Sequence, residues 1–460
     1  MKNNVIDDQT DGTEQSVIKE GSLKPSFTEQ DHHFMLRAIE LAKKGHFTTS
    51  PNPRVGCVLV NYQAGVGKVI GEGYHQKAGE GHAEVNALAE ARINNINLIK
   101  GATAYVTLEP CSHFGLTPPC AKALIDAEVG HVIAAMVDPN PKVSGRGLSL
   151  LEKAGIKVQS GLLEHNAKQL NVGFIHKMIN DLPYVRCKLA ASLDGKTAMA
   201  SGESQWITSS DARQDVQRLR AQSCAIITGA DSVLFDNAKM NVRWSELGEL
   251  KDNYPEKTLR QPLRVVIDSQ NRLTPKLALF EYDSPVLIVT GITDELAQRV
   301  NQGIVNDNVE NKRLSNIEND HQWPHFVEQV QLPLVSKTLS NTLSNTQSHK
   351  QTNTQTKNSD VTLKIDLKAL LADLAKRGFN DVLIESGAQL SGAFIEQDLV
   401  NELILYQAPK LMGGDGKNLM EMPSVLKLNQ AKALIINDIS RVGCDIRITS
   451  QFIPNAETTQ

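Results

Sequence analysis

Three side chains able to bind a metal ion lie far apart in the sequence, and bringing them together would constrain the whole N-terminal half of the chain. His82 precedes an alanine-, leucine- and glutamate-rich run that predicts a helix over 83–93. Cys111 follows the β-branched and aromatic run 103–108, which predicts a strand, and Cys120 follows a Pro-Pro pair at the start of a second predicted helix. All three therefore stand at a strand end or a helix N-terminus, where backbone N–H dipoles favour a thiolate.

One imidazole and two thiolates with an open fourth position are typical of a catalytic zinc site rather than a structural one. Zinc held in this way lowers the pKa of its bound water and makes hydroxide available near neutral pH. Glu84, two residues after the histidine, would then transfer protons, as the non-ligand glutamate of zinc deaminases does. Taken singly, His82-x-Glu84 could be a helix start with a solvated glutamate, and the cysteines could be buried thiols. Their conjunction favours zinc-dependent hydrolytic chemistry.

The length of 460 residues indicates two domains. With 40% hydrophobic and 22% charged residues and no long apolar run, the composition is that of a soluble protein, and no membrane partner is expected. The polar N-terminus lacks a secretory signal and six cysteines are too few for a disulfide framework, so a cytoplasmic location is expected. The net charge of −4 gives no general attraction to nucleic acid, which is also not expected as a partner.

The order of the predicted elements is that of two successive α/β domains. Residues 1–28 have few large apolar residues and are predicted to be a disordered extension. The first series of helices and strands is predicted at 31–44, 55–60, 69–73, 83–93, 103–108, 121–127, 131–137, 147–154 and 157–158. After a bridge at 174–183, the second series is predicted at 184–190, 210–222, 225–228, 263–267, 286–290, 367–377, 381–384 and 403–407. The Asn-, Thr-, Ser- and Gln-rich stretch 305–362 is predicted to be a low-complexity insertion, either a surface loop or disordered, because it cannot supply a packed core.

Several other positions could belong to a site or could be ordinary structure. Asn52 and His75 lie in loops beside the first strands, where they could hydrogen-bond a pyrimidine. The run 385–388 (ESGA) follows a strand and opens a helix, which suits a phosphate but also serves as a generic connector. The polar run 188–196 could line a cleft or form a capped turn. The remaining cysteines stand in apolar, strand-like runs and are predicted to be inert core residues: Cys57, Cys187, Cys224 and Cys444.

The chain also carries a set of longer motifs: PNPRVGCV (51–58), GHAEVNAL (81–88), VTLEPCSHFGLTPPC (106–120), DPNPKVSGRG (138–147), KLAASLDGKTAMASGESQWIT (188–208), RVVIDSQNR (264–272), ESGAQLSGAF (385–394) and APKLMGG (408–414). This set resembles the bifunctional deaminase–reductase family of riboflavin biosynthesis. The long spacing between the two cysteines, filled by SHFGLTPP, is particular to this family among deaminases. The resemblance runs from about Asp31 to Phe452, apart from the insertion.

The resemblance implies an α/β fold class, with an N-terminal cytidine deaminase-like α/β/α domain over 29–173 and a C-terminal dihydrofolate reductase-like domain over 183–455. The first domain would carry out zinc-hydroxide deamination of 2,5-diamino-6-(5-phosphoribosylamino)pyrimidin-4-one. The second would use NADPH to reduce the ribosyl group of 5-amino-6-(5-phosphoribosylamino)uracil to ribityl. One Zn²⁺ per chain and a homodimer or tetramer formed through the reductase domain are also implied.

Matched position by position, the resemblance assigns His82, Cys111 and Cys120 to zinc and Glu84 to proton transfer. The positions that match substrate contacts are Asn52, His75, Lys188, Ser204, Arg220, Met240, Arg243 and Glu385. The positions that match NADPH contacts are Ala190, Trp206, Ser232, Asp236, Gly387, Ala388, Gln389, Leu390, Ser391 and Gly392. The arginines suit a substrate phosphate, because a guanidinium can donate two parallel hydrogen bonds to it.

Departures from the family pattern leave open a narrower function, in which only one of the two activities is retained. Leu116 stands where the family usually has Lys or Arg, and leucine cannot pair with a phosphate. A second cation would have to compensate, or only the reductase half would be active. In the segment 232–244, Ala238 and Asn241 replace the usual proline and threonine, whereas Asp236 and Arg243 remain.

Two rival classes of function are less compatible with the sequence. A nucleic-acid-editing deaminase would need a basic, aromatic-rich second half, and the chain is only 5% aromatic. A non-catalytic assembly protein with a structural zinc would have no use for Glu84.

Overall fold

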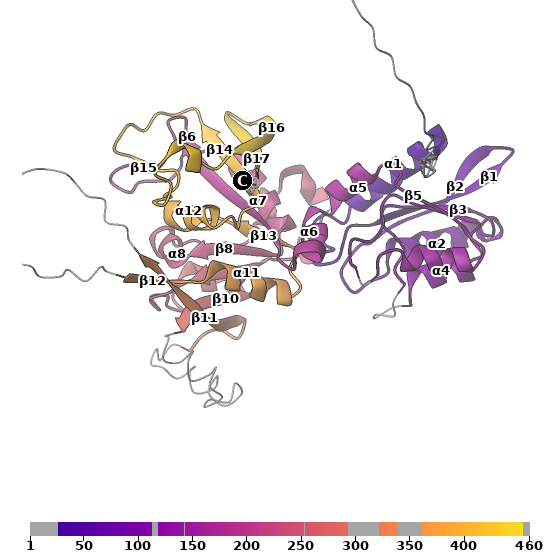
Figure 1. Ribbon diagram of the computed structural model, residues 1–460, viewed down its shortest axis with the longest axis horizontal. Helices are drawn as coiled ribbons and strands as arrows, with labels where there is room; N and C mark the ends of the chain where they lie inside the picture. The colour runs from indigo at the N-terminus through magenta and orange to yellow at the C-terminus, as the bar shows by residue number, and fades with distance from the viewer. Residues whose placement is uncertain are drawn as a thin grey trace, which may run out of the picture.

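The computed structural model describes residues 26–112, 118–141, 143–252, 254–292, 322–338 and 361–453. Two α/β domains lie side by side, and helix α6 (Val172–Asn180) lies between them (Figure 1). The predicted disordered extension at 1–28 falls almost entirely outside the described residues, as do Leu116 and much of the predicted insertion.

A five-stranded mixed sheet forms the centre of the N-terminal domain, in the order β2-β1-β3-β4-β5. Its strands are β1 (Gly56–Gln63), β2 (Val66–Tyr74), β3 (Thr103–Val106), β4 (His131–Ala134) and β5 (Lys157–Ser160). β1 and β2 form an antiparallel hairpin, whereas β3, β4 and β5 are parallel. The parallel strands bring their carboxyl ends to one edge of the sheet, where Cys111 follows β3.

Helices cover both faces of this sheet, with α1 (Glu29–Lys43) and α5 (Glu164–Leu170) on one face and α2 (Ala83–Asn94) and α4 (Arg146–Lys153) on the other (Figure 1). α3 (Cys120–Asp126) shares the apolar core of α2 and α4. An apolar core lies on each face of the sheet, and β1 contributes side chains to both because successive residues of a strand point to opposite faces. Val58 faces the α1 side, whereas Cys57 and Leu59 face the α2 side. Helix α2 approaches β2 closely because Gly71 and Gly73 have no side chains. A Cβ on Gly73 would lie 2.3 Å from the carbonyl oxygen of Ala83. This contact fixes the first turn of α2 and hence the position of His82.

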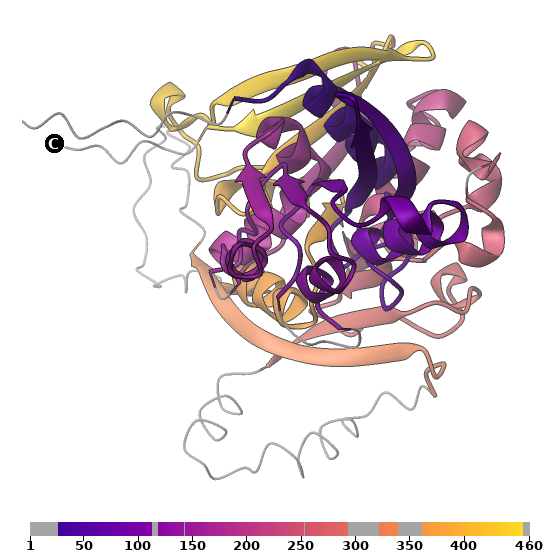
Figure 2. The same cartoon turned by 90° about the vertical axis from the view of Figure 1, so that its right-hand side faces the viewer.

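The C-terminal domain is built on a ten-stranded sheet in the order β12-β11-β10-β9-β8-β13-β6-β14-β17-β16. Its strands are β6 (Tyr184–Ser192), β8 (Ala225–Gly229), β9 (Leu263–Ile267), β10 (Val286–Ile292), β11 (Val327–Thr338), β12 (Val361–Ile365), β13 (Asp381–Ile384), β14 (Glu402–Ala408), β16 (Leu434–Val442) and β17 (Asp445–Phe452). The strands from β11 to β14 are parallel, and β12, β17 and β16 add antiparallel edges. β11 and the β16–β17 hairpin lie at opposite sides of the domain (Figure 2).

The α-helices in the described part of this domain are α7 (Ser210–Gln222), α8 (Ala230–Asp236), α11 (Leu367–Lys376) and α12 (Ala388–Glu396). The largest apolar cluster joins α11 and α12 to the central parallel strands through residues such as Leu371, Phe394 and Val382. A small two-stranded sheet, β7 (Lys196–Ala198) with β15 (Lys417–Asn418), stands apart from the large one. The predicted α/β fold class is thus confirmed, and each predicted helix and strand is present within a few residues of its expected bounds.

Two sequence predictions need correction, whereas the bridge predicted at 174–183 is present and is mostly formed by α6. The stretch 305–362 is not wholly a loop, because its apolar segment Val327–Thr338 forms β11 within the parallel sheet. Cys444 is exposed in the turn between β16 and β17 rather than in a core, whereas Cys57, Cys187 and Cys224 are buried as predicted.

Polar and aromatic contacts join the two domains. The Nε2 atom of His46 lies 2.7 Å from Oε1 of Gln222 at the end of α7, and the hydroxyl of Tyr254 donates to the Lys44 carbonyl oxygen over 2.7 Å. Phe47 packs edge-on against Tyr254, with 4.7 Å between the ring centroids. Burial, reinforced by the neighbouring Arg54 guanidinium, lowers the pKa of His46 to about 3. His46 is therefore neutral in the folded protein at any pH near neutrality.

The neutral His46 makes the stability of the folded protein sensitive to acid. Its folded-state pKa lies below the unfolded value, so between about pH 6.5 and 3 the unfolded chain binds a proton that the folded chain does not. We expect His46 to contribute a loss of stability of up to about 2 kcal/mol between pH 7 and pH 5. In His46→Gln this part of the loss should disappear in urea denaturation followed by circular dichroism. His33→Gln, at an exposed position on α1, should keep the wild-type pH dependence. An unchanged acid dependence in His46→Gln would contradict the assignment.

Candidate active sites

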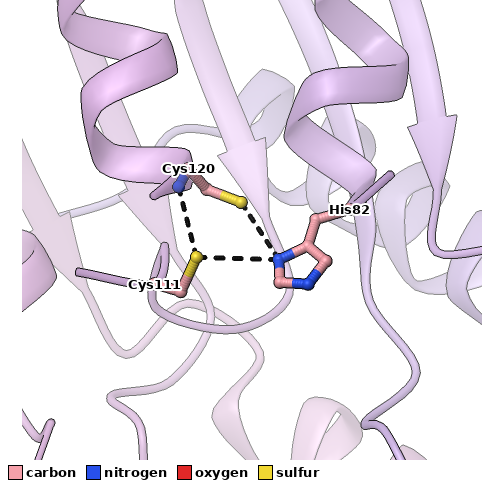
Figure 3. Close-up of side chains that lie close together, drawn as sticks. All are labelled: His82, Cys111 and Cys120. Atoms are coloured by element: carbon pink, nitrogen blue, oxygen red, sulfur yellow. Dashed lines mark hydrogen bonds between the residues drawn. The ribbon is translucent and has the colours of Figure 1, made fainter. Parts of the chain in front are cut away.

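His82, Cys111 and Cys120 converge at the carboxyl edge of the first sheet (Figure 3). His82 is the N-cap of α2, Cys120 is the first residue of α3, and Cys111 lies in the loop after β3. The Nδ1 atom of His82 is 3.1 Å from the Cys120 sulfur and 3.6 Å from the Cys111 sulfur, and the Cys120 backbone N–H donates to the Cys111 sulfur over 3.2 Å. The three ligand atoms lie within 4.8 Å of one another. One imidazole and two sulfurs in such a cluster fit a zinc ion with a fourth position left for water or substrate.

The hydrogen bonds within this cluster favour a thiolate. Those from Cys120 and His82 hold the pKa of Cys111 well below its usual value. The same Cys111 thiolate raises the pKa of His82. A thiolate that already exists near neutral pH is ready to bind a metal cation, because the thiolate and not the thiol is the ligand.

Glu84 is on the first turn of α2, two residues after His82, and it interacts with the thiols of the same cluster. It is only 3% exposed, and its Oε2 atom has no hydrogen-bond partner among the described residues. Burial, together with the negative charge of Cys111, raises the pKa of Glu84 to about 7. A buried carboxyl group with a free oxygen and such a pKa can both accept and release a proton near neutral pH.

Glu109 anchors the segment that carries Cys111, a role that sequence reasoning missed. Its buried carboxylate accepts hydrogen bonds from the backbone N–H groups of Asp138, Gly145 and Gly147, at 3.0, 2.9 and 2.8 Å. These three N–H groups belong to the DPNPKVSGRG motif at the start of α4. The sequence signal that could have revealed this role is a glutamate at a strand end where a glycine-rich loop must turn back.

The structure also brings Asn52 and His75 next to the metal cluster. The Asn52 side-chain amide lies 3.2 Å from Nε2 of the buried His75 ring, whose Nδ1 is 3.1 Å from the Gly81 carbonyl oxygen. The His75 ring packs edge-on against His82 with 5.3 Å between centroids. Burial lowers the pKa of His75, so its ring is neutral. A neutral ring that donates from Nδ1 to Gly81 must accept from the Asn52 amide, which leaves Oδ1 of Asn52 free to accept from a ligand.

In the second domain, several charged side chains surround Glu385, which follows β13. Arg220 on α7 donates to both Glu385 oxygens, over 2.6 and 2.9 Å, and both side chains are nearly buried. Lys188, on the neighbouring strand β6, is close enough to Glu385 to interact with its charge, as is Arg243. Burial opposes ionisation of Glu385, but Arg220 and Lys188 together hold its pKa below the usual range. Burial also lowers the pKa of Lys188.

The positions matched to NADPH lie around the carboxyl ends of the parallel strands. Gly387 is the exposed N-cap of α12, and Ala388 to Gly392 form the first turns of that helix. Ala190 is on β6, whereas Ser232 and Asp236 are on α8, which begins directly after β8. A Cβ on Gly229 would lie 3.6 Å from Leu390, so the starts of α8 and α12 face each other across the edge of the sheet. Such an edge, with free helix N-terminal N–H groups, fits the phosphates of a dinucleotide.

Loops from opposite ends of the domain's sequence close over this edge. Asp194 accepts hydrogen bonds from the backbone N–H groups of Met412 and Gly413, at 3.1 and 2.8 Å. The Lys410 side chain donates to the Trp206 carbonyl oxygen over 2.8 Å. Trp206 is 62% exposed, and the Arg213 guanidinium lies 4.5 Å from the centroid of its ring. Ser204 lies two residues away in the same loop. The motifs at 188–208 and 408–414 therefore form one structural unit.

Two of the side chains matched to substrate contacts, Met240 and Arg243, already interact with other parts of the protein. The Met240 side chain is buried in an apolar cluster with Ile226 and Val266, so it packs the core. Arg243 is engaged by Glu246 over 2.6 and 2.8 Å. A phosphate at this site would therefore share the Arg243 guanidinium with a carboxylate.

The buried Arg220–Glu385 pair should be strongly coupled. Arg220→Leu leaves the Glu385 carboxylate buried without its main partner and should cost about 3–5 kcal/mol of stability. The double variant Arg220→Leu/Glu385→Leu should lose clearly less than the sum of the single losses. All three tryptophans lie in the second domain, so denaturation followed by tryptophan fluorescence reports on it. The exposed pair Lys239–Glu281, in the same domain, should show coupling below about 1 kcal/mol. Additive losses for Arg220 and Glu385 would show that the two side chains stabilise the domain independently of each other.

Comparison with known proteins identifies both domains. Residues 28–136 match the family described as cytidine and deoxycytidylate deaminase zinc-binding region, and residues 183–448 match the RibD C-terminal domain. The chain is 45% identical to riboflavin biosynthesis protein RibD of Escherichia coli, over 91% of this chain and 98% of that protein. The protein of the same name from Haemophilus influenzae is 43% identical, over 92% and 98%.

Solved structures resemble this chain over both domains. Acinetobacter baumannii RibD is 38% identical with a TM-score of 0.73, and 92% of this chain is aligned with 99% of that one. A diaminohydroxyphosphoribosylaminopyrimidine deaminase/5-amino-6-(5-phosphoribosylamino)uracil reductase from Thermotoga maritima is 29% identical with a TM-score of 0.69, over 92% and 99%.

The fold and the two sites define a bifunctional enzyme, in which a zinc-dependent deaminase domain precedes an NADPH-dependent reductase domain. The chain belongs to the RibD family of riboflavin biosynthesis proteins. Zn²⁺ and NADPH are accordingly its cofactors.

Proposed function

We propose that the first domain deaminates 2,5-diamino-6-(5-phosphoribosylamino)pyrimidin-4-one. The second domain then reduces the ribosyl group of 5-amino-6-(5-phosphoribosylamino)uracil to ribityl with NADPH. The observation that carries the first step is the juxtaposition of Glu84, buried and without a hydrogen-bond partner on Oε2 among the described residues, with the cluster of His82, Cys111 and Cys120. The Thermotoga maritima relative, which is named for both activities, supports the choice of both substrates.

Zn²⁺ bound by His82, Cys111 and Cys120 would supply Lewis acidity and an activated water. Glu84 would accept one proton of the attacking water on a carboxylate oxygen and pass it to the pyrimidine ring nitrogen. It would then take the second proton, from the hydroxyl now on C2, and deliver it to the amine, so that ammonia leaves and the C2 oxygen becomes a carbonyl. The Glu84 pKa of about 7 suits both directions of transfer. Asn52, held by His75, would orient the pyrimidine by accepting a hydrogen bond on Oδ1.

NADPH would supply the hydride for the reduction at C1′ of the opened ribose. The first turns of α12, together with Ala190, Trp206, Ser232 and Asp236, would hold the dinucleotide at the carboxyl edge of the sheet. Lys188 and Arg243, with the Arg220–Glu385 pair between them, would position the substrate. Ser204 and Met240 would complete the pocket, Met240 through its backbone because its side chain is in the core.

The narrower alternative is a chain in which only the reductase works because Leu116 disables the deaminase. Leu116 lies outside the described residues, and the full-length similarity to bifunctional relatives does not favour this alternative. Mass spectrometry of the products separates the two. Purified protein should replace the amino group of the diaminopyrimidine ribotide by oxo without NADPH, and the product should gain two hydrogens when NADPH is added.

Glu84→Gln is the matched variant for this experiment. It should abolish deamination while one zinc per chain remains bound and the uracil ribotide is still reduced, because the amide cannot transfer the proton. Loss of zinc from Glu84→Gln would show that Glu84 is a ligand instead. Reduction of the uracil ribotide by the unmodified chain, without deamination of its precursor, would establish the alternative.

We also propose that the chain forms a homodimer or tetramer through β16. This strand is at the edge of the large sheet and exposes Ile435, Ile436 and Ile439 to 55%, 56% and 63%. An exposed apolar edge strand is a template for pairing with a second copy. A cytoplasmic location is supported by the free cysteines, none of which forms a disulfide in the described structure.

Replacement of Ile436 and Ile439 by lysine should convert the oligomer to a monomer, because paired edges would then bring like charges together. Light scattering coupled to size-exclusion chromatography measures the mass. Ile93→Lys, at a 76% exposed position on α2, should leave the mass unchanged. A monomeric unmodified chain at micromolar concentration, or an unchanged mass in the double variant, would refute the proposal.

A further inference from the structure

A groove beside the zinc ligands takes no part in the zinc, proton or hydride chemistry of the two sites. It has a volume of about 730 Å³ and begins at Ser112, the residue after the zinc ligand Cys111. Its other wall is the first two turns of α4 and the loop before them, including Ser144, Arg146, Ser149 and Lys153.

The groove is rigidly connected to the zinc site. The Glu109 carboxylate binds the backbone N–H groups of Gly145 and Gly147, the two residues on either side of Arg146. Gly147 lies so close to the strand end that a Cβ there would be 1.9 Å from the Pro110 carbonyl oxygen. Arg146 is therefore fixed through its backbone to the segment that carries Cys111.

The charges of the groove are all positive. Arg146 and Lys153 are the charged residues of its lining, and neither has an ion-pair partner among the described residues. Ser112, Ser144 and Ser149 add hydroxyl groups that can donate hydrogen bonds. A guanidinium, an ammonium and several hydroxyls around an open groove suit a phosphate monoester, because its dianion accepts charge-assisted hydrogen bonds from all of them.

We propose that this groove binds the 5′-phosphate of the deaminase substrate, with Arg146 as the main contact and Lys153 as the second cation. The pyrimidine would lie at Glu84, and the phosphoribosyl group would extend past Ser112 into the groove. This assignment rests on the proposed function, and it provides cations for the phosphate in a chain that has leucine at position 116. It makes Arg146 a residue that selects the phosphorylated substrate.

The test compares deamination of the ribotide with that of the same compound lacking the phosphate. Arg146→Gln should lower kcat/KM for the ribotide about ten- to a hundredfold, mainly through KM, because a charge-assisted contact made in the ground state is lost. The phosphate-free compound should react equally with both proteins, and Arg146→Lys should recover part of the loss. Lys122→Gln, on α3 and outside the groove, should behave as the unmodified chain. Zinc content and the reductase activity serve as checks that each variant is folded.

An equal loss with both compounds would show that Arg146 only supports the structure of the site, and no loss with the ribotide would exclude it from phosphate binding. Either result overturns the proposal. If the unmodified chain deaminates neither compound, the proposed function fails and the groove is tested by itself. Ribose 5-phosphate should then bind the unmodified chain in calorimetry and bind Arg146→Gln at least about tenfold more weakly. Equal binding, or no binding to the unmodified chain, would refute the site independently of the activity.

Discussion

The Glu109 carboxylate is the interaction on which the deaminase site depends. It accepts three hydrogen bonds from the backbone of the 138–147 loop, and through them it sets the distance between the end of β3 and the start of α4. A buried carboxylate is stable only when its hydrogen-bonding capacity is satisfied, so the loop and the strand end order each other. The position of Cys111 follows from this arrangement, because it stands two residues after Glu109.

The reductase site uses a glutamate at the corresponding place in its own sheet, but with a different partner. Glu385 follows a parallel strand as Glu109 does, yet it is neutralised by a guanidinium and not by backbone amides. The two glutamates therefore differ in what they make available to a substrate. Backbone amides leave the Glu109 segment fixed and inert, whereas the Arg220–Glu385 pair keeps charged groups at a place where a substrate can meet them.

The sequence predicted the parts of this structure that depend on local patterns. The residue pattern of β1 and the composition of α2 were enough to predict a strand and a helix. The prediction that a deaminase domain is followed by a reductase domain came from the resemblance to the family. The strand β11 was missed because its apolar segment is surrounded by polar, low-complexity sequence, and only pairing with β10 makes it a strand. The engagement of Arg243 by Glu246 and the burial of Met240 depend on tertiary packing, which a matched motif does not contain.

The pairing of β11 with β12 implies that additional residues can be inserted between these two strands at little cost in stability. Thr338 and Val361 are opposite each other in an antiparallel ladder, so the residues that join them start and end at neighbouring points on the edge of the sheet. The entropy of closing such a connection grows only with the logarithm of its length, by about 0.6 kcal/mol for each doubling. Both active sites are formed by other strand ends and loops. A reporter domain with adjacent termini could therefore be inserted at this point while both catalytic centres keep their supporting contacts.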